Sequence, residues 1–363
     1  FLIAGFINLS PQFGANPSYK QKRLYSKYPN HNDETFSNLQ ETPLFTEEIS
    51  YMDFFNDEIV TPSTPTKVDS DRLPKEKIIP QMIDLDSFRK IGINDYKITW
   101  LGHSAFMLNI NGKIILLDPM LGSHAAPIPL PSLERYSKEL PFDLKLLENI
   151  DMVIFSHDHY DHLDYPTIKR IRDKVSIFIV PIGIGNHLRS WKVNDENIVE
   201  LNWDENIIID DIEFTCLPSR HFSGRGPFNR RTTLWASWAI KSSAVKIYFS
   251  GDSGYGKHFK EIGEKHGPFD LSLLDSGQYN IAWKHSHMFP FQSVQAAQDL
   301  KSKFFMPIHW AGFTLSMHPW DEPINKSIEY AKKAGLKYIA PEIGQILSGN
   351  SLNKEFLPWW EQY

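Results

Sequence analysis

The chain has 363 residues, a formal net charge of −6 and a single cysteine, Cys216. A chain of this length can bury a large core, and one main domain with an extension fits it better than two equal domains. The acidic balance argues against a nucleic-acid-binding protein, which usually presents a basic surface. One cysteine excludes a disulfide within the chain, and its place inside a strand pattern indicates a small core residue.

The first part of the chain is predicted to be an extension rather than a domain. Residues 1–7 are apolar but too few to span a bilayer, which takes about 20 residues, so we expect them to face a membrane or to pack on the domain. Residues 61–66 have the Thr- and Pro-rich composition of a linker, whereas residues 45–55 carry aromatic side chains that can pack. We therefore predict an extension over residues 1–93, draped over a domain that spans residues 94–363.

From about residue 94 the pattern becomes a succession of strands and helices. Residues 96–101, 105–110 and 113–117 are typical of strands, and the Asn-Gly pair between the last two favours a hairpin turn. Helices are expected over residues 290–301 and 321–335, because apolar residues recur there at helical spacing behind a start signal. The sequence thus predicts a mixed α/β fold.

Four further strand patterns are followed by histidine or aspartate. The apolar run 152–155 precedes Ser156-His-Asp-His-Tyr-Asp-His-Leu-Asp164, and the strand patterns 212–217, 245–249 and 304–308 precede one more candidate each. The seven candidate metal ligands are His157, His159, Asp161, His162, His221, Asp252 and His309. Five imidazoles and two carboxylates suit two zinc-type ions, and an aspartate can bridge such a pair.

The motif H-x-H-x-D-H and the three ligands behind it resemble the metallo-β-lactamase superfamily over residues 94–345. Closer similarity is to the branch of N-acylphosphatidylethanolamine-hydrolysing phospholipases D and their bacterial relatives. It is carried by Thr99-Trp-Leu-Gly-His-Ser104, Leu234-Trp-Ala-Ser-Trp238 and Gly267-Pro-Phe-Asp270. Sugar-phosphate lactonases of the superfamily share the run through Asp164, so that motif alone does not separate the two branches. The resemblance implies an αββα sandwich of two sheets between helices.

The resemblance also implies how the ligands divide between two Zn²⁺ ions, although Fe or Mn can occupy similar donors. One ion is expected on His157, His159 and His221, the other on Asp161, His162 and His309, and Asp252 is expected to bridge them. The implied activity is that of a dinuclear zinc phosphodiesterase. A hydroxide bridging the metals would cleave N-acylphosphatidylethanolamine to phosphatidic acid and N-acylethanolamine.

Further residues are predicted to support this chemistry. Asp161 or Asp252 is expected to hold or relay the proton, and His287 aligns with a family histidine expected to contact the phosphate or leaving group. Metal-bound imidazoles usually donate their second N–H to a carboxylate or carbonyl, and Asp118 and Asp164 are the candidates for that contact. The alternatives are a turn before Pro119 for Asp118 and helix capping for Asp164.

Substrate recognition is predicted at Arg220, Arg225 and Trp310, because guanidinium groups suit phosphate oxygens and aromatic rings suit acyl chains. The alternatives are a solvated loop for the arginines and core packing for the aromatic residue. The expected partners are a phospholipid substrate, a membrane surface touched peripherally on its cytoplasmic or periplasmic side and, by resemblance, a second copy of the chain.

Two other classes of function remain open from the sequence. A metal-dependent lactonase or other ester hydrolase, acting on a sugar phosphate or lactone, would use the same metals on an acyl centre. A non-enzymatic scaffold with this fold is disfavoured because all seven ligands are present.

Overall fold

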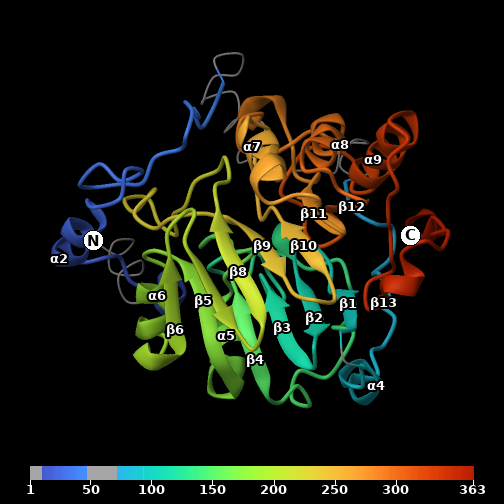
Figure 1. Cartoon of the computed structure of the whole chain (residues 1–363), viewed down its shortest axis with the longest axis horizontal. Coiled ribbons are helices and arrows are strands. Elements are labelled where there is room, and N and C mark those ends of the chain that lie inside the picture. The colour runs from blue at the N-terminus through green and yellow to red at the C-terminus, as the bar shows by residue number, and fades with distance from the viewer. Residues whose placement is uncertain (1–9, 47–71, 93) are drawn as a thin grey trace.

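The computed structural model describes residues 10–46, 72–92 and 94–363 (Figure 1). The apolar residues 1–7, the linker 61–66 and most of the aromatic segment 45–55 lie outside these ranges, so the predictions made for them stay predictions.

The strands and helices follow one another in the α/β order expected from the sequence. The strands are β1 (Tyr96–Trp100), β2 (Phe106–Ile110), β3 (Lys113–Leu117), β4 (Ile150–Ile154), β5 (Val175–Pro181), β6 (Ile198–Leu201), β7 (Asn206–Ile209), β8 (Ile212–Leu217), β9 (Ser237–Lys241), β10 (Lys246–Phe249), β11 (Leu271–Asp275), β12 (Phe304–Ile308) and β13 (Ile346–Ser348). The α-helices are α2 (Tyr19–Tyr25), α4 (Leu85–Arg89), α5 (Tyr165–Ile171), α6 (Gly185–Ser190), α7 (His258–Lys265), α8 (Pro290–Asp299) and α9 (Glu322–Lys333). Short 3₁₀ turns lie at Pro11–Phe13, Pro131–Leu133, Arg172–Lys174, Asp195–Asn197, Ile281–Trp283, Gly349–Ser351 and Trp359–Gln362.

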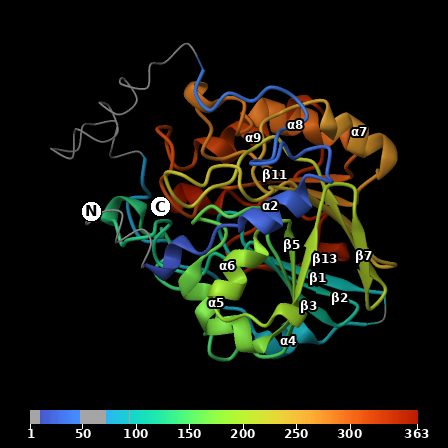
Figure 2. The same ribbon diagram turned by 90° about the vertical axis from the view of Figure 1, so that its left-hand side faces the viewer.

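Two sheets lie face to face between two layers of helices, which confirms the predicted αββα sandwich. One sheet has the order β13-β1-β2-β3-β4-β5-β6 and the other β12-β11-β10-β9-β8-β7. Figure 2 shows α5 and α6 on the outer side of the first sheet and α7, α8 and α9 on the outer side of the second.

Alternation along the strands explains this layering. In β2, Phe106, Leu108 and Ile110 face the core between the sheets, whereas Met107 faces the cluster on the α5–α6 side. In β10, Ile247 belongs to the inner core and its neighbour Tyr248 to the cluster under α7 and α8. Because successive side chains of a strand point to opposite faces, strands that are apolar at every position can be covered on both sides.

The parallel strand pairs gather their carboxyl ends at one edge of the sandwich. β3, β4, β5 and β6 run parallel in the first sheet, and β10, β11 and β12 run parallel in the second. Ligand sites of open α/β sheets lie beyond such ends. The loops that follow β3, β4, β8, β10, β11 and β12 therefore meet where the two sheets face each other.

The described part of the predicted extension packs on the sandwich. Figure 1 shows the N-terminal segment, residues 10–46, running from α2 beside α6 toward α7. Phe36 is fully buried and belongs to the core between the sheets, and Gln21 of α2 donates a hydrogen bond to Asn186 of α6 at 2.6 Å. None of the helices formed by the described residues has the length and apolar run that crossing a bilayer requires.

Five tryptophans form a cluster beside β1 and the end of β12. The ring of Trp310 lies 5.3 Å from Trp100, 6.2 Å from Trp320, 5.6 Å from Trp359 and 5.8 Å from Trp360. Trp310 is only 1% exposed. The prediction that Trp310 binds substrate is therefore wrong: it follows a residue at the site, but its side chain turns into the core.

Replacing Trp310 by alanine is expected to lower the free energy of unfolding by about 3–5 kcal/mol, because the truncation leaves a cavity among four other indoles. Urea denaturation followed by circular dichroism measures the loss. Leu357 is the control, because it lies two residues before Trp359 of the cluster but is itself 77% exposed. Its replacement by alanine should change the free energy by less than about 0.5 kcal/mol, and equal effects of the two substitutions would contradict this packing.

Candidate metal centre

The loop that follows β4 presents four of the predicted ligands at the edge of the first sheet. The backbone N–H groups of His162 and Leu163 donate to the carbonyl of His159 at 3.1 and 2.8 Å, so the loop curls back on itself. The curl brings His157, His159, Asp161 and His162 to the same edge of the sheet, and all four are buried except His159, which is partly exposed.

Asp252 lies at the centre of the cluster. Its Oδ2 is 3.1 Å from Nε2 of His162, 3.4 Å from Nε2 of His309, 3.6 Å from Nε2 of His157 and 3.8 Å from Nε2 of His221. Gly251 before it has a φ of +53°, and a Cβ there would lie 2.3 Å from that of Ser156, so the chain can pass this close to the β4 loop only with glycine.

The ligand atoms fall into two groups that meet at Asp252. His157, His159, His221 and Asp252 offer atoms that all lie within 4.8 Å of one another. On the other side, Oδ2 of Asp161 is 3.1 Å from Nε2 of His309 and 3.4 Å from Nε2 of His162. The structure thus brings all seven predicted ligands together, and their division between two metal ions stays a prediction.

The cluster fits a pair of divalent cations. Oδ1 of Asp252 is buried and makes no hydrogen bond to any of the described residues, and a buried polar atom without a partner is rare and costly. Nε2 of His157 and Nδ1 of His159 approach to 2.9 Å. Imidazole and carboxylate donors that converge in this way are the usual ligands of zinc-type ions.

Electrostatics point to positive charge at the same place. Burial lowers the pKa of His157 and of His221 well below the usual value and keeps them in the neutral form that binds a cation. Burial also opposes protonation of His309, but the nearby carboxylates of Asp252 and Asp275 outweigh it and raise its pKa to about 10. The carboxylates beside His309 therefore favour a positive charge at this place, whether it is a proton on the imidazole or a bound cation.

Buried groups behind the ligands fix the orientation of the imidazoles. Nδ1 of His162 shares a hydrogen bond with Asp118 at 2.7 Å, and Nδ1 of His221 donates to the carbonyl of Ser286 at 2.9 Å. Asp118 also accepts from the backbone N–H of Ser156 at 2.7 Å, which ties the start of the ligand loop to the end of β3. Asp118 therefore has the supporting contact expected of it.

Asp275, at the end of β11, is a site residue that the sequence analysis missed. Its two carboxylate oxygens bind Nδ1 of His287 at 2.9 Å and Nδ1 of His309 at 3.2 Å, and the residue is fully buried. The strand pattern Leu271–Leu274 followed by an aspartate carries the same signal as the strand ends that were recognised. Asp275 sets the orientation of one ligand and of the predicted catalytic histidine together.

His103 is the second residue that was missed at the site. Its Nε2 lies 2.8 Å from Oδ2 of Asp161, and its ring centre is 4.3 Å from that of His309. Its backbone has a φ of +55°, a left-handed conformation that few residues other than glycine adopt. In the sequence this histidine appears only as part of the motif Thr99-Trp-Leu-Gly-His-Ser104; in the structure it orients the carboxylate of Asp161.

Asp164 has a different role from the one predicted. Its carboxylate accepts from the backbone N–H of Thr167 at 2.9 Å and caps the N-terminus of α5. This is the helix-capping alternative, and it arises because Asp164 already lies beyond the curled ligand loop, at the residue before the first turn of the helix.

The two arginines predicted to bind substrate are engaged in holding backbone. Arg225 is 1% exposed, and its guanidinium donates to the carbonyls of Asp158 at 2.6 Å, Leu163 at 2.7 Å and Gln12 at 2.6 and 3.0 Å. Arg220 donates to the carbonyls of Glu41 at 2.8 Å and Tyr255 at 3.0 Å. Buried and bound to these carbonyls, Arg225 is not placed to contact a phosphate, so that prediction is wrong for Arg225. Arg220 is only partly buried and keeps N–H donors beyond these two contacts, so its predicted contact with phosphate stays a prediction.

A cavity of about 240 Å³, which we call the metal cavity, opens onto the ligands. The site residues that line it are His159, Asp161, Asp252, His287 and His309. Its other walls are mostly apolar and consist of Leu44, Phe45, Phe222, Gln278, Trp283, Ser286 and Leu315. The structure therefore places His287 beside the ligands and on the cavity wall, where a bound substrate would lie.

Comparison with known proteins gives the family. Residues 113–310, which include all seven ligands, match the model of the Beta-lactamase superfamily domain. The chain belongs to the metallo-β-lactamase superfamily. It is a metal-dependent hydrolase of the fold that this superfamily shares.

Two relatives show how similar this chain is in sequence to other proteins. An uncharacterized protein of Mycobacterium tuberculosis is 36% identical over 336 residues, which cover 92% of this chain and 87% of that protein. N-acyl-phosphatidylethanolamine-hydrolyzing phospholipase D 1 of Caenorhabditis elegans is 32% identical over 230 residues, 60% of this chain and 64% of that enzyme. The chain therefore spans less than two thirds of the length of that phospholipase.

The solved structure of a metallo hydrolase from Ignicoccus hospitalis has the same fold. It superimposes with a TM-score of 0.52 at 20% identity and covers 72% of this chain and 100% of that chain.

Replacing Asp275 by asparagine is expected to weaken zinc binding by about 10- to 100-fold, because an amide can no longer accept from both His287 and His309. Competition with a chromophoric chelator measures the affinity. Asp164→Asn is the matched control: it alters a helix cap outside the cluster and should leave the affinity within about twofold while it lowers stability by about 1 kcal/mol or less. Equal zinc affinity in the Asp275 variant and the wild type would show that Asp275 does not support the ligands.

Proposed function

We propose that this protein is a dinuclear zinc phosphodiesterase that hydrolyses N-acylphosphatidylethanolamine to N-acylethanolamine and phosphatidic acid. The observation that carries the proposal is the complete set of seven ligands clustered around Asp252, four of which line a cavity whose other walls are mostly apolar. The similarity to a phospholipase of this specificity supports the choice of substrate.

Two bound divalent ions would supply a water molecule of lowered pKa and would polarise the phosphoryl oxygens. Residues of the chain would take up the proton and contact the substrate. Asp161 and Asp252 hold carboxylate oxygens within the cluster, where either can take up the proton of an attacking water. His287 has its Nδ1 fixed by Asp275, so we assign contact with the phosphate or the leaving oxygen to its Nε2.

The size of the metal cavity bears on how a lipid would bind. At about 240 Å³ it is smaller than the roughly 300–1,000 Å³ of sites that enclose a drug-sized ligand. It can accept a phosphate and the linked ethanolamine amide but not the acyl chains. A lipid substrate would therefore keep its chains in the bilayer while the head group enters, which requires the protein to touch the membrane.

The loop beyond His221 is the surface we propose for this contact. Phe228 at its tip is 94% exposed. The side chain of Asn229 accepts from the backbone N–H groups of Arg225 at 3.1 Å and Gly226 at 2.7 Å, which holds the tip in a fixed shape. Arg230 lies 4.6 Å over the ring of Phe222, a wall of the metal cavity, so the loop that carries the exposed ring of Phe228 also places a cation against that wall. This combination suits an anionic lipid surface.

Mass spectrometry of vesicles containing N-acylphosphatidylethanolamine, after incubation with the zinc-loaded protein, tests the reaction. We expect phosphatidic acid and N-acylethanolamine, and a loss of at least about 1,000-fold in rate for Asp252→Asn, because its carboxylate is central to both ligand groups. Intact lipid, with two zinc ions per chain confirmed, would reject the phosphodiesterase. Hydrolysis of a phosphorylated lactone by the same sample would then favour the lactonase.

Replacing Phe228 by aspartate is expected to reduce both binding to vesicles and hydrolysis of vesicle lipid by about tenfold or more, since burial of a Phe side chain contributes roughly 1.5–3 kcal/mol. Cleavage of the water-soluble bis(p-nitrophenyl) phosphate should not change. Leu357→Asp, which alters another well-exposed apolar residue, is the matched control. If both variants bind vesicles as the wild type does, the loop is not the membrane contact.

A further inference from the structure

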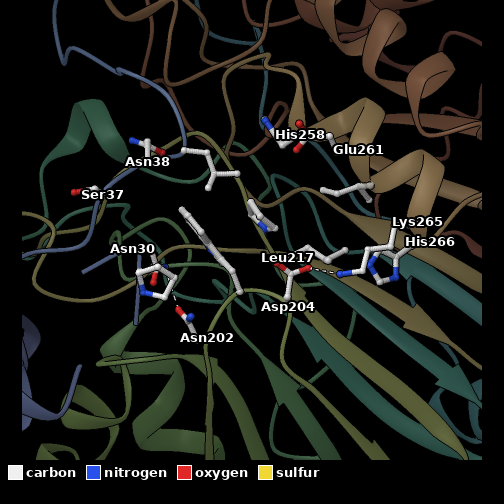
Figure 3. A pocket seen from close by; sticks show the side chains of 15 residues that line it. Asn30, Ser37, Asn38, Asn202, Asp204, Leu217, His258, Glu261, Lys265 and His266 are labelled. Atoms are coloured by element: carbon white, nitrogen blue, oxygen red, sulfur yellow. Dashed lines mark hydrogen bonds and ion pairs between the residues drawn. The ribbon is translucent and has the colours of Figure 1, made fainter. Parts of the chain in front are cut away.

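A second, larger cavity lies beside α7 (Figure 3). Its volume is about 700 Å³, inside the roughly 300–1,000 Å³ range of small-molecule sites. It is enclosed by residues 29–30 and 37–39 of the N-terminal segment, the loop 202–204, the end of β8 and one face of α7. We call it the α7 cavity. None of the seven ligands is among the described residues that line it.

The inner walls of the α7 cavity are apolar. Trp203, Leu217 and Ile262 line it and are at most 7% exposed, so they form a firm floor. Leu39 of the N-terminal segment lines it from the opposite side and is 52% exposed, an unusual position for leucine in a cavity wall. An occupant with an apolar body would remove mainly the exposed surface of Leu39 from water and would rest on a floor that is already nearly buried.

The charges around the α7 cavity cancel. Lys265 pairs with Asp204 at 2.7 Å, and Glu261 pairs with Lys257 at 3.5 Å. Burial lowers the pKa of His258 to about 3, so this imidazole carries no charge at neutral pH. The cavity therefore offers no net charge to attract an ionised head group, and a neutral occupant fits it better.

Two polar groups of the wall have a buried atom without a partner among the described residues, Oδ1 of Asn30 and Nε2 of His266. Asn30, 9% exposed, donates through Nδ2 to Asn202 at 3.0 Å, but its Oδ1 is buried and accepts no hydrogen bond. The neighbouring side chain of Asn38 differs, because its Oδ1 accepts from the N–H of His221 and from the indole of Trp235 and its Nδ2 donates to the carbonyl of His221. The unused acceptor of Asn30 calls for a ligand that carries a donor.

We propose that the α7 cavity binds a neutral amphiphile with one apolar chain and an N–H or O–H donor at its polar end. The chain would lie on Trp203, Leu217 and Ile262 beneath Leu39, and the donor would reach Oδ1 of Asn30. The inference stands on this cavity alone and holds whichever ester the metal centre hydrolyses. A fatty acid amide is the simplest molecule with these features.

Isothermal titration calorimetry with N-oleoylethanolamine at pH 8, on the full zinc-loaded chain, tests the proposal. Leu39→Asp places a charge on the wall of the α7 cavity and is expected to weaken binding by about tenfold or more. Leu44→Asp is the matched control, because it makes the same change on the same segment but on the wall of the metal cavity. It should leave the affinity within about twofold. Thermal unfolding of both variants checks that they are folded.

Two further measurements define the polar end. Asn30→Ala is expected to weaken N-oleoylethanolamine about fivefold, the loss of one hydrogen bond. Oleate, which is ionised at pH 8 and has no donor, should bind at least about tenfold more weakly than the amide. The proposal is overturned if Leu44→Asp weakens the amide more than Leu39→Asp does, since the probe then occupies the metal cavity. It is equally overturned if oleate binds as well as the amide, or if the amide does not bind.

Discussion

A single carboxylate oxygen, Oδ2 of Asp252, lies within 3.8 Å of four imidazoles that come from three different loops. Asp161 adds a second carboxylate at the same place, and Asp118 and Asp275 stand directly behind the imidazoles. Burying four carboxylates so close together is costly unless positive charge compensates them. The centre is therefore stable as a unit only with protons or metal ions in it, and the fold serves to hold the donors for the ions.

The sandwich and the N-terminal segment share that task. The parallel strands deliver the ligands at their carboxyl ends, but the ligand loop after β4 is fixed from outside. Arg225 binds the carbonyl of Asp158 in that loop and the carbonyl of Gln12 in the segment, and His187 connects the carboxylate of Asp158 to the backbone of Ala15. Farther along the segment, Asn38 holds the backbone of His221.

These contacts show that the N-terminal segment supports the metal site as well as covering the sandwich. A segment that only covered the core would contact the sandwich mainly through apolar side chains, as Phe36 does. The polar contact of residue 38 instead ends on the metal ligand His221, and those of residues 12 and 15 end on Arg225 and His187, which hold Asp158 in the ligand loop. The same segment supplies Leu44 to the metal cavity and Leu39 to the α7 cavity, so it takes part in both sites. Displacing it would disturb the metal centre and both cavities together.

The sequence predicted the fold and the ligands because both depend on short-range patterns. Apolar strand runs ending in His or Asp identify positions that a parallel sheet brings together, and the same reasoning extends to Asp275, which was overlooked although it ends such a run. Arg225 and Trp310 were misjudged for another reason. Nothing in a sequence distinguishes a guanidinium that binds buried carbonyls from one that faces a phosphate, or an indole in the core from one in a groove. Both depend on long-range contacts, as does the α7 cavity, whose walls come from distant parts of the chain.

Anomalous X-ray diffraction at the zinc absorption edge, on crystals of the zinc-loaded protein, tests the central claim most directly. Two anomalous peaks on either side of the Asp252 carboxylate are predicted, one contacted by His157, His159 and His221 and the other by Asp161, His162 and His309. A single peak, or peaks that Asp252 does not contact, would contradict the view that this aspartate joins two metal sites.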